Sequence, residues 1–291
     1  MKLATEDLLA LRNFACKAAS TAAHHIQQNV GKISAVRHKK GMQSKASAVV
    51  TEIDLQCQEL ILDVLKDTFQ EYDLGLLTEE LTDDGSRLIK DYFWCIDPLD
   101  GTLAFTENRP GYAVSIALVS KDGEPVIGVV HDPVNDELYS GINGAGSNMP
   151  DRFEEEKQML SCYFDNSIKY HPHKHIIVRE LRQLVEKLGL DDLQIHYGKG
   201  AVLNASYVAR SQNGVYLKFP KREQGGGCIW DFAATACLFE ETGLIVSDIS
   251  GGKLPFNDHQ SLYFNQCGVI YASNTIIQKA IIDLFHLLKD M

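Results

Sequence analysis

Two carboxylates with the spacing of a divalent-cation site follow a hydrophobic segment of this sequence. Asp97 and Asp100 come directly after the apolar run Tyr92–Ile96, with a proline between them. Because proline lacks an amide N–H and disfavours helix at the residue before it, we expect a buried strand to stop at Asp97. Gly101 then lets the backbone approach a ligand closely, and Thr102 adds a hydroxyl. Two acids beside unpaired amides suit a divalent cation with a bound phosphate, and an acidic turn that caps a helix is the simpler alternative.

Three further acids stand where regular elements are expected to begin or end. Glu79 closes the short apolar segment Leu74–Thr78, Asp54 lies in the first turn of an expected helix, and Asp231 opens another helix after a run of glycines. An acid at a helix start is favoured as a cap, since its oxygen accepts a hydrogen bond from a free amide. Taken singly, Asp54 and Asp231 therefore need no chemical role.

The pattern of apolar residues predicts an α+β first half with antiparallel strands and an α/β second half, which we place at residues 1–145 and 146–291. In the first half we expect a mobile loop over 31–47, helices over 5–28 and 54–69, and strands over 74–78, 92–97, 112–119, 126–131 and 137–141. In the second half we expect helices over 176–188, 203–210 and 274–289, and strands over 194–198, 214–219, 244–249 and 267–272. Residues 143–167, with several glycines and the acidic run Glu154–Glu156, are expected to form a boundary or a surface excursion.

The composition describes a globular protein rather than a nucleic-acid-binding or membrane protein. The 291 residues are 45% hydrophobic and 23% charged, with a net charge of −11. A nucleic-acid footprint would be basic and clustered, no apolar run reaches the roughly 18–20 residues of a membrane span, and the N-terminal segment lacks a signal-peptide layout. Seven scattered cysteines without a CxxC pair indicate reduced core residues of a cytoplasmic protein.

Four blocks together resemble the inositol monophosphatase superfamily of magnesium-dependent, lithium-sensitive phosphatases. They follow the family's order and spacing and are Val50–Asp54, Leu77–Glu80, Asp97–Thr102 (DPLDGT) and Trp230–Ala234 (WDFAA). The resemblance implies an α/β (α+β) fold, the layered α/β/α/β/α sandwich of this superfamily, with the metal site between the two halves. It also implies hydrolysis of a small phosphorylated metabolite, and a homodimer as a family-level expectation.

The resemblance implies a set of metal ligands as well. One Mg²⁺ would be held by Glu79, Asp97 and the backbone carbonyl of Leu99. Asp97 would bridge to a second Mg²⁺ that Asp100 and Asp231 also bind, and Glu79 would reach a third, weaker ion. Such oxygen-only ligation is what Mg²⁺ prefers.

The same resemblance assigns the catalytic groups. Thr102 and Glu79 would orient and deprotonate the attacking water, with Asp54 hydrogen-bonded to Thr102, and the amides of Gly101 and Thr102 would grip the phosphate. The metal ions would neutralise the phosphate oxygens, activate the water and stabilise the leaving alkoxide. Histidine is not needed, and we expect an exposed loop or a strand end for His171, His173 and His175.

Substrate choice is expected in a wall formed by residues 198–204 and 218–224. The substrate-binding residues implied by the resemblance are Asp100, Gly101, Thr102, Gly200, Ala201, Gln224 and Asp231. Gln224 stands where inositol phosphatases have an acid that grips ring hydroxyls. Asn204 favours the inositol branch, whereas the segment Leu262–Asn274 favours the bisphosphonucleotidases.

The alternatives therefore stay open. Inositol-1-phosphate-like sugars lead slightly, and 3′(2′),5′-bisphosphonucleosides come second. Fructose-1,6-bisphosphatase and a metal-binding interaction protein without turnover follow. The basic trio in the second part of the wall is either a solvated strand end or a contact for a second phosphate, and it consists of Lys218, Lys221 and Arg222.

Overall fold

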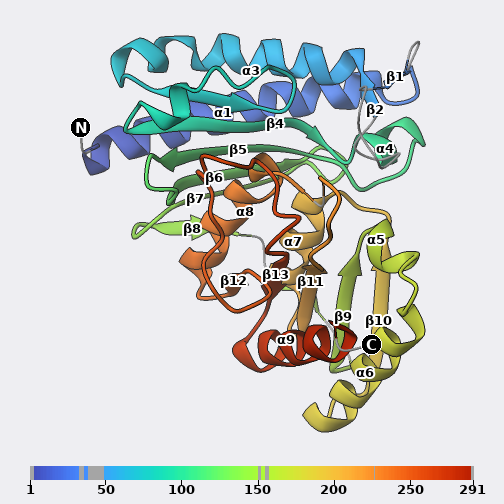
Figure 1. Cartoon of the computed structure of the whole chain (residues 1–291). Coiled ribbons are helices and arrows are strands. Elements are labelled where there is room, and N and C mark those ends of the chain that lie inside the picture. Colours follow the sequence, from blue (N-terminus) through green and yellow to red (C-terminus); the bar gives the residue numbers. More distant parts are fainter. Residues whose placement is uncertain are drawn as a thin grey trace.

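The computed structural model describes residues 3–32, 36–38, 49–149, 152–154, 157–225 and 227–289, which form five layers (Figure 1). Helices α1 and α3 cover one face of a six-stranded sheet. Helices α7 and α8 fill the space between this sheet and a five-stranded sheet, and α6 and α9 cover the outer face of the second sheet. The expected α/β/α/β/α sandwich is confirmed.

The outermost layer is a pair of long helices, α1 (Thr5–Asn29) and α3 (Glu52–Glu71), which confirms the two helices expected in the first half. Small side chains allow α3 and the sheet to approach α1 closely, because the distance between packed elements depends on the side chains at the contact. The buried stripe of α1 contains Ala15, Ala18, Ala19, Ala22 and Ala23.

The loop expected over residues 31–47 contains a strand. Strand β1 (Val36–His38) pairs antiparallel with β2 (Val49–Thr51), so the loop prediction is wrong for residues 36–38. Pairing with a distant segment stabilises a strand that three residues could not form alone. Lys39, Lys40 and Gly41, the rest of the basic cluster, lie outside the described residues.

The six-stranded sheet has the order β3-β4-β5-β6-β7-β8, in which only the β3–β4 pair is parallel. Its strands are β3 (Gly75–Thr78), β4 (Tyr92–Asp100), β5 (Ala113–Ser120), β6 (Pro125–Asp132), β7 (Glu137–Ile142) and β8 (Gly146–Asn148). Phe93 and Cys95 of β4 belong to the core around α8. Since side chains alternate along a strand, Asp97 follows them on the face toward α8.

Strand β4 does not stop at Asp97 as expected but continues to Asp100. Its pairing with β5 shifts register between Asp97, opposite Ser115, and Asp100, opposite Ala113. Pro98 lies inside this bulge, where its missing N–H breaks no ladder hydrogen bond. The bulge thereby brings both acids to one strand end.

The five-stranded sheet has the order β10-β9-β11-β13-β12, with β9, β10 and β11 parallel and β13 antiparallel to both of its neighbours. Its strands are β9 (Met159–Phe164), β10 (Asp192–Tyr197), β11 (Gly214–Lys218), β12 (Ile245–Ser247) and β13 (Val269–Ala272). Strand β9 lies within the expected boundary region 143–167, so that interpretation is wrong for these six residues. The residues of β9 follow the acidic run directly, and a short apolar stretch of this length has no clear periodicity in the sequence.

The remaining helices connect and cover these sheets. They are α4 (Thr102–Thr106), α5 (Asn166–Lys169), α6 (Lys174–Leu188), α7 (Ala201–Arg210), α8 (Ile229–Thr242) and α9 (Thr275–Lys289), with a 3₁₀ turn η1 at Ser86–Leu88. Helices α6, α7 and α9 are three of those expected in the second half, and α8 is the helix expected to begin near Asp231. In the described part of the chain, none of the helices has the length and hydropathy needed to span a membrane. All seven cysteines are described, and all are free thiols.

Candidate active site

The carboxylates of Asp97, Asp100 and Asp231 meet in one cluster, in which an oxygen of each lies within 4.8 Å of the others. Asp97 and Asp100 come from the end of β4, and Asp231 comes from the first turn of α8, which packs on that face of the sheet. The fold thus brings together three acids that the sequence assigned to one metal site.

The crowding of these acids, two of them buried and Asp231 half-buried, makes their ionised forms costly. Burial, followed by the charges of Glu79 and Asp100, raises the pKa of Asp97 well above its usual range. Burial and the charge of Asp231 raise the pKa of Asp100 to about 8. Burial also raises the pKa of Asp231 to about 6, although the charge of Lys218 opposes this shift. A divalent cation between the carboxylates would remove the repulsion.

Asp231 serves the start of α8 as well as the cluster. It is the third residue of the helix rather than its cap, and its Oδ2 accepts a hydrogen bond of 2.7 Å from the amide of Cys228. A carboxylate has two oxygens and several lone pairs, so helix capping and cation binding are compatible. The contact with the helix start therefore does not exclude a metal-ligand role for Asp231.

Asp100 is held by the start of α7. Its Oδ1 accepts a hydrogen bond from the amide of Ala201 at 3.1 Å, and its Oδ2 accepts one from the amide of Val202 at 2.8 Å. A Cβ at Gly200 would lie 2.2 Å from the same Oδ2, so the close approach requires glycine. Two residues predicted for the substrate wall, Gly200 and Ala201, thus contact a predicted metal ligand.

Glu79 lies at the edge of the cluster. Its amide donates a hydrogen bond of 3.2 Å to the carbonyl of Ile96, which extends the pairing of β3 with β4. This pairing sets Glu79 beside Asp97 in the neighbouring strand, in agreement with the effect of its charge on the Asp97 pKa. The side chain of Glu79 is half-buried.

Thr102 and Asp54 form the hydrogen bond that the resemblance implied. The Oγ1 of Thr102 is 3.0 Å from Oδ1 of Asp54 and 3.1 Å from the carbonyl oxygen of Leu99. A hydroxyl has one proton, so it donates to one of these acceptors at a time. The amide of Leu99 in turn donates to Oδ1 of Asp97 at 3.0 Å, which orients that acid.

Gly101 makes the turn between β4 and α4. Its φ is +83°, and a Cβ would lie 2.5 Å from the carbonyl oxygen of Gly111. Both the left-handed backbone and the close approach favour glycine over any other residue. The turn starts α4 at Thr102, directly after Asp100.

Residues 218–224 are divided between the interior and the surface. Arg222 and Gln224 are exposed, and among the described residues no hydrogen bond joins Gln224 to the acids. Lys218 is half-buried and pairs with Asp165, with 2.9 Å between Nζ and Oδ2. The solvated strand end is therefore the wrong interpretation for Lys218. The sequence analysis missed Asp165, whose only signal was its position after β9, a strand that was itself not predicted.

The three histidines lie at the start of α6 rather than at a strand end. His171 and His173 are in the turn before the helix, with the amide of His173 donating to Nδ1 of His171 at 3.1 Å, and His175 is in the first helical turn. Within the described ranges, the three aspartates form the one group of acids, histidines or cysteines that is compact enough to hold a metal ion.

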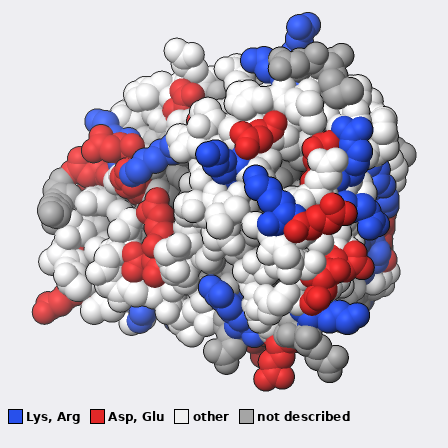
Figure 2. Space-filling view, turned by 90° about the horizontal axis from the view of Figure 1, so that it is seen from below, with Lys and Arg blue, Asp and Glu red and all other residues white. Residues whose placement is uncertain are grey.

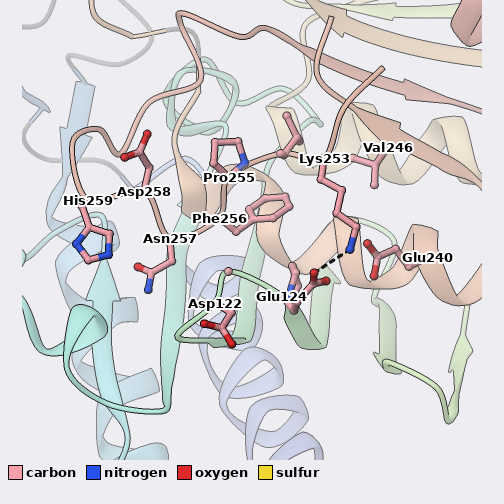
Figure 3. Close-up of a pocket in the computed structure, with 13 residues that line it drawn as sticks. Asp122, Glu124, Glu240, Val246, Lys253, Pro255, Phe256, Asn257, Asp258 and His259 are labelled. Carbon is pink, nitrogen blue, oxygen red and sulfur yellow. Dashed lines mark hydrogen bonds and ion pairs between the residues drawn. The ribbon is translucent and has the colours of Figure 1, made fainter. Parts of the chain in front are cut away.

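A separate cavity of about 350 Å³ lies near the C-terminal end of α8 (Figure 3). It is lined by the turn between β5 and β6, by Glu240 and by residues 253–259, and Lys253 pairs with Glu124 across it at 2.8 Å. Asp231 stands in the first turn of the same helix, about 13 Å away along the helix axis. None of the predicted site residues lines this cavity.

Charged side chains on the face shown in Figure 2 are mixed in sign. Lys and Arg residues stand among Asp and Glu residues over the described part of this face. A nucleic-acid footprint needs a continuous basic area, which this face does not offer.

Comparisons with known proteins agree with the motifs. The model of the inositol monophosphatase family matches residues 7–289. "Nus factor SuhB" of Xylella fastidiosa is 28% identical over 253 residues, 84% of each chain. A Thermotoga maritima protein named "Fructose-1,6-bisphosphatase/inositol-1-monophosphatase" is 27% identical over 249 residues, 82% of this chain and 85% of that one. The solved structure of a Thermotoga maritima inositol monophosphatase superposes with a TM-score of 0.73 at 23% identity and covers 96% and 97% of the two chains, which shows the shared fold.

Proposed function

Since the chain belongs to the inositol monophosphatase family, we propose that it is a Mg²⁺-dependent phosphatase that hydrolyses a small phosphate monoester. Inositol-1-phosphate-like sugars are the leading substrate class, and 3′(2′),5′-bisphosphonucleosides are the second. The observation that carries the proposal is the cluster of Asp97, Asp100 and Asp231. The carboxylates of this cluster suit a cation, and Asp100 lies two residues before Thr102, whose hydroxyl is oriented by the buried carboxylate of Asp54.

The donor set fits Mg²⁺. All of the candidate ligands are oxygens, and the carboxylates of Asp97, Asp100 and Asp231, of which the first two are buried and the third is half-buried, repel one another in the absence of a cation. Residues 1–145 would supply Glu79, Asp97, Leu99 and Asp100, and residues 146–291 would supply Asp231, enough for two ions and a third, weaker one at Glu79. When bound, the metal ions would neutralise the phosphate oxygens and make a bound water nucleophilic.

The protein's own groups would then direct the water. Thr102 donates its proton to Asp54, which leaves a lone pair of the hydroxyl to accept a hydrogen bond from water. Asp54 is only 2% exposed, so solvent does not compete for this bond. Glu79, half-buried at the edge of the cluster, would take the other proton as the general base. The amides of Gly101 and Thr102 would hold the phosphate.

The substrate is the finer part of the proposal. The contacts of Gly200 and Ala201 with Asp100 support a substrate wall next to the metal ligands. The Thermotoga maritima relative is named for activity on both a sugar bisphosphate and an inositol monophosphate, so fructose 1,6-bisphosphate belongs among the candidates.

The test is the release of inorganic phosphate from inositol 1-phosphate, adenosine 3′,5′-bisphosphate and fructose 1,6-bisphosphate, with Mg²⁺ and with EDTA. We expect Mg²⁺-dependent turnover that is fastest on inositol 1-phosphate. An Asp97→Asn preparation made in the same way controls for contaminating phosphatases. Absence of turnover on all three compounds would refute the proposal. Turnover that is faster on adenosine 3′,5′-bisphosphate than on inositol 1-phosphate would make bisphosphonucleosides the leading substrate class.

The relatives named "Nus factor SuhB" supply a second candidate, a metal-binding interaction protein with this fold. Their printed name describes a factor rather than a hydrolase. Mg²⁺ binding without turnover of any compound in the panel would favour this candidate.

A further inference from the structure

A partly buried ion pair lies at the carboxyl ends of two neighbouring strands in the second sheet. Tyr163 of β9 is paired in register with Tyr216 of β11, and these strands are parallel. Two residues further along each strand come Asp165 and Lys218, which therefore emerge on the same face of the sheet at the same end. Their Oδ2 and Nζ atoms are 2.9 Å apart, and their side chains are only 23% and 15% exposed.

The lysine end of this pair faces α8, the helix whose first turn contains Asp231. Tyr163 and Tyr216 belong to the core that the second sheet shares with α7 and α8, so Lys218 also faces α8. Its Nζ lies 5.8 Å from the centre of the Phe232 ring, and Phe232 is the residue after Asp231. In agreement with this position, the charge of Lys218 lowers the pKa of Asp231.

The surroundings of the ammonium group make its charge effective over several ångströms. The ring of Phe232 lies beside it, and Tyr216, two residues earlier in β11, is fully buried. The hydroxyl of Tyr216 has no hydrogen-bond partner among the described residues, so it does not solvate the pair. Charges interact more strongly in such surroundings than in water.

We propose that Lys218 is a resident cation that lowers the divalent-metal affinity of the position formed by Asp100 and Asp231, and that Asp165 holds its ammonium group in place. Lys218 acts here as a positioning residue and is not itself a ligand. A fixed positive charge partly neutralises the acids and repels an incoming Mg²⁺, so this position is weaker than its carboxylates alone would make it. The inference rests on the proposed metal site but not on the identity of the substrate.

The test is the binding of Mg²⁺ alone, measured by titration calorimetry. Tryptophan fluorescence in a Trp94→Phe background, which leaves Trp230 before Asp231 as the single tryptophan, gives a second readout. Asp165→Asn with Lys218→Met removes both charges at nearly constant volume, and we expect Mg²⁺ to bind about tenfold or more tightly. Asp165→Asn alone keeps the ammonium and removes its opposing carboxylate, and we expect weaker binding. Structural disturbance would weaken Mg²⁺ binding in both variants. Tighter binding in the double variant and weaker binding in Asp165→Asn would therefore indicate an electrostatic role.

Two controls complete the experiment. Lys218→Arg keeps the charge and should stay close to wild type. Lys253→Met removes an ion-paired lysine that is 79% exposed at the other end of α8, and it should leave Mg²⁺ affinity unchanged. Unchanged or weaker binding in the folded double variant would overturn the inference. If that variant does not fold, Asp165→Asn decides alone, and unchanged or tighter binding refutes the role of Lys218. Normal Mg²⁺ binding without phosphatase turnover would refute only the proposed function, whereas wild-type protein that binds no Mg²⁺ would refute both.

Discussion

Replacement of Gly200 by alanine should strongly lower phosphatase activity while the fold persists. The backbone of Gly200 has φ −64° and ψ 172°, which alanine adopts without strain, so the effect comes from the added methyl group alone. The new Cβ would lie 2.2, 2.5 and 2.6 Å from Oδ2, Cγ and Oδ1 of Asp100. Because β4 fixes the backbone of Asp100 in the sheet, the carboxylate must turn away.

The size of the effect follows from the contacts that are lost. The turned carboxylate gives up its hydrogen bonds from the amides of Ala201 and Val202, at 3.1 and 2.8 Å. A hydrogen bond to a charged group contributes about 1.5–3 kcal/mol, so losing both costs roughly 3 kcal/mol or more. If the productive geometry of Asp100 requires both bonds, kcat/KM falls by about a hundredfold or more.

The assay combines turnover, Mg²⁺ affinity and thermal unfolding. We expect kcat/KM and Mg²⁺ affinity to fall together while the melting temperature changes by only a few degrees. Gly252→Ala is a matched control, because its Cβ would lie 3.0 Å from the carboxylate of Asp248 in a surface turn, away from the site. Turnover within threefold of wild type in Gly200→Ala would refute the argument that the α7 start positions Asp100.

Four further outcomes test the site. Asp97→Asn should keep the fold but lower activity by more than roughly 100-fold, because replacing residues that only support metal ligands already costs up to that much. Activity within tenfold of wild type would contradict the assignment of Asp97 as a shared ligand. Thr102→Val should lower kcat by about 10²-fold or more while Thr102→Ser stays active, since only the hydroxyl orients water; equal loss in both would indicate a packing role. Li⁺ at millimolar concentration should inhibit turnover, and full activity in high Li⁺ at limiting Mg²⁺ would count against the proposed second metal position. The pKa of Asp100 rises from 3.8 to about 8 on folding, so its contribution to metal-free stability is present below pH 3.8 and is lost as the pH rises through about 8. The gain in melting temperature from Mg²⁺ should therefore grow over this pH range. A gain that does not depend on pH would refute the linkage.

The sequence alone was sufficient for features that depend on neighbouring residues. The apolar stripe of α1 repeats with the period of a helix, and the turn residues 121–125 between two strand-like segments predicted the hairpin of β5 and β6. The family motifs also identified Asp97, Asp100 and Asp231 as candidate ligands, because the motif residues are contiguous within short blocks.

Short elements that depend on distant partners were not visible in the sequence. The three residues of β1 become a strand only through pairing with β2, and β9 is defined by its neighbours β10 and β11. The bulge that carries β4 past Pro98 exists because β5 supplies partners on both sides of it. Local propensity acts over a few residues and contains no information about such partners.

The chemical type of the site residues was therefore set by the sequence, and their arrangement was decided by the tertiary structure. Acids next to a proline, a glycine and a hydroxyl indicate a cation and a phosphate wherever they occur. The packing of the two sheets around α7 and α8 decides which groups meet. It gives Asp100 its hydrogen bonds from two amides of α7, and it places the Lys218–Asp165 pair beside α8. Packing brings together side chains that lie far apart in the chain, and burial then makes their charges strong enough to shift one another's pKa values.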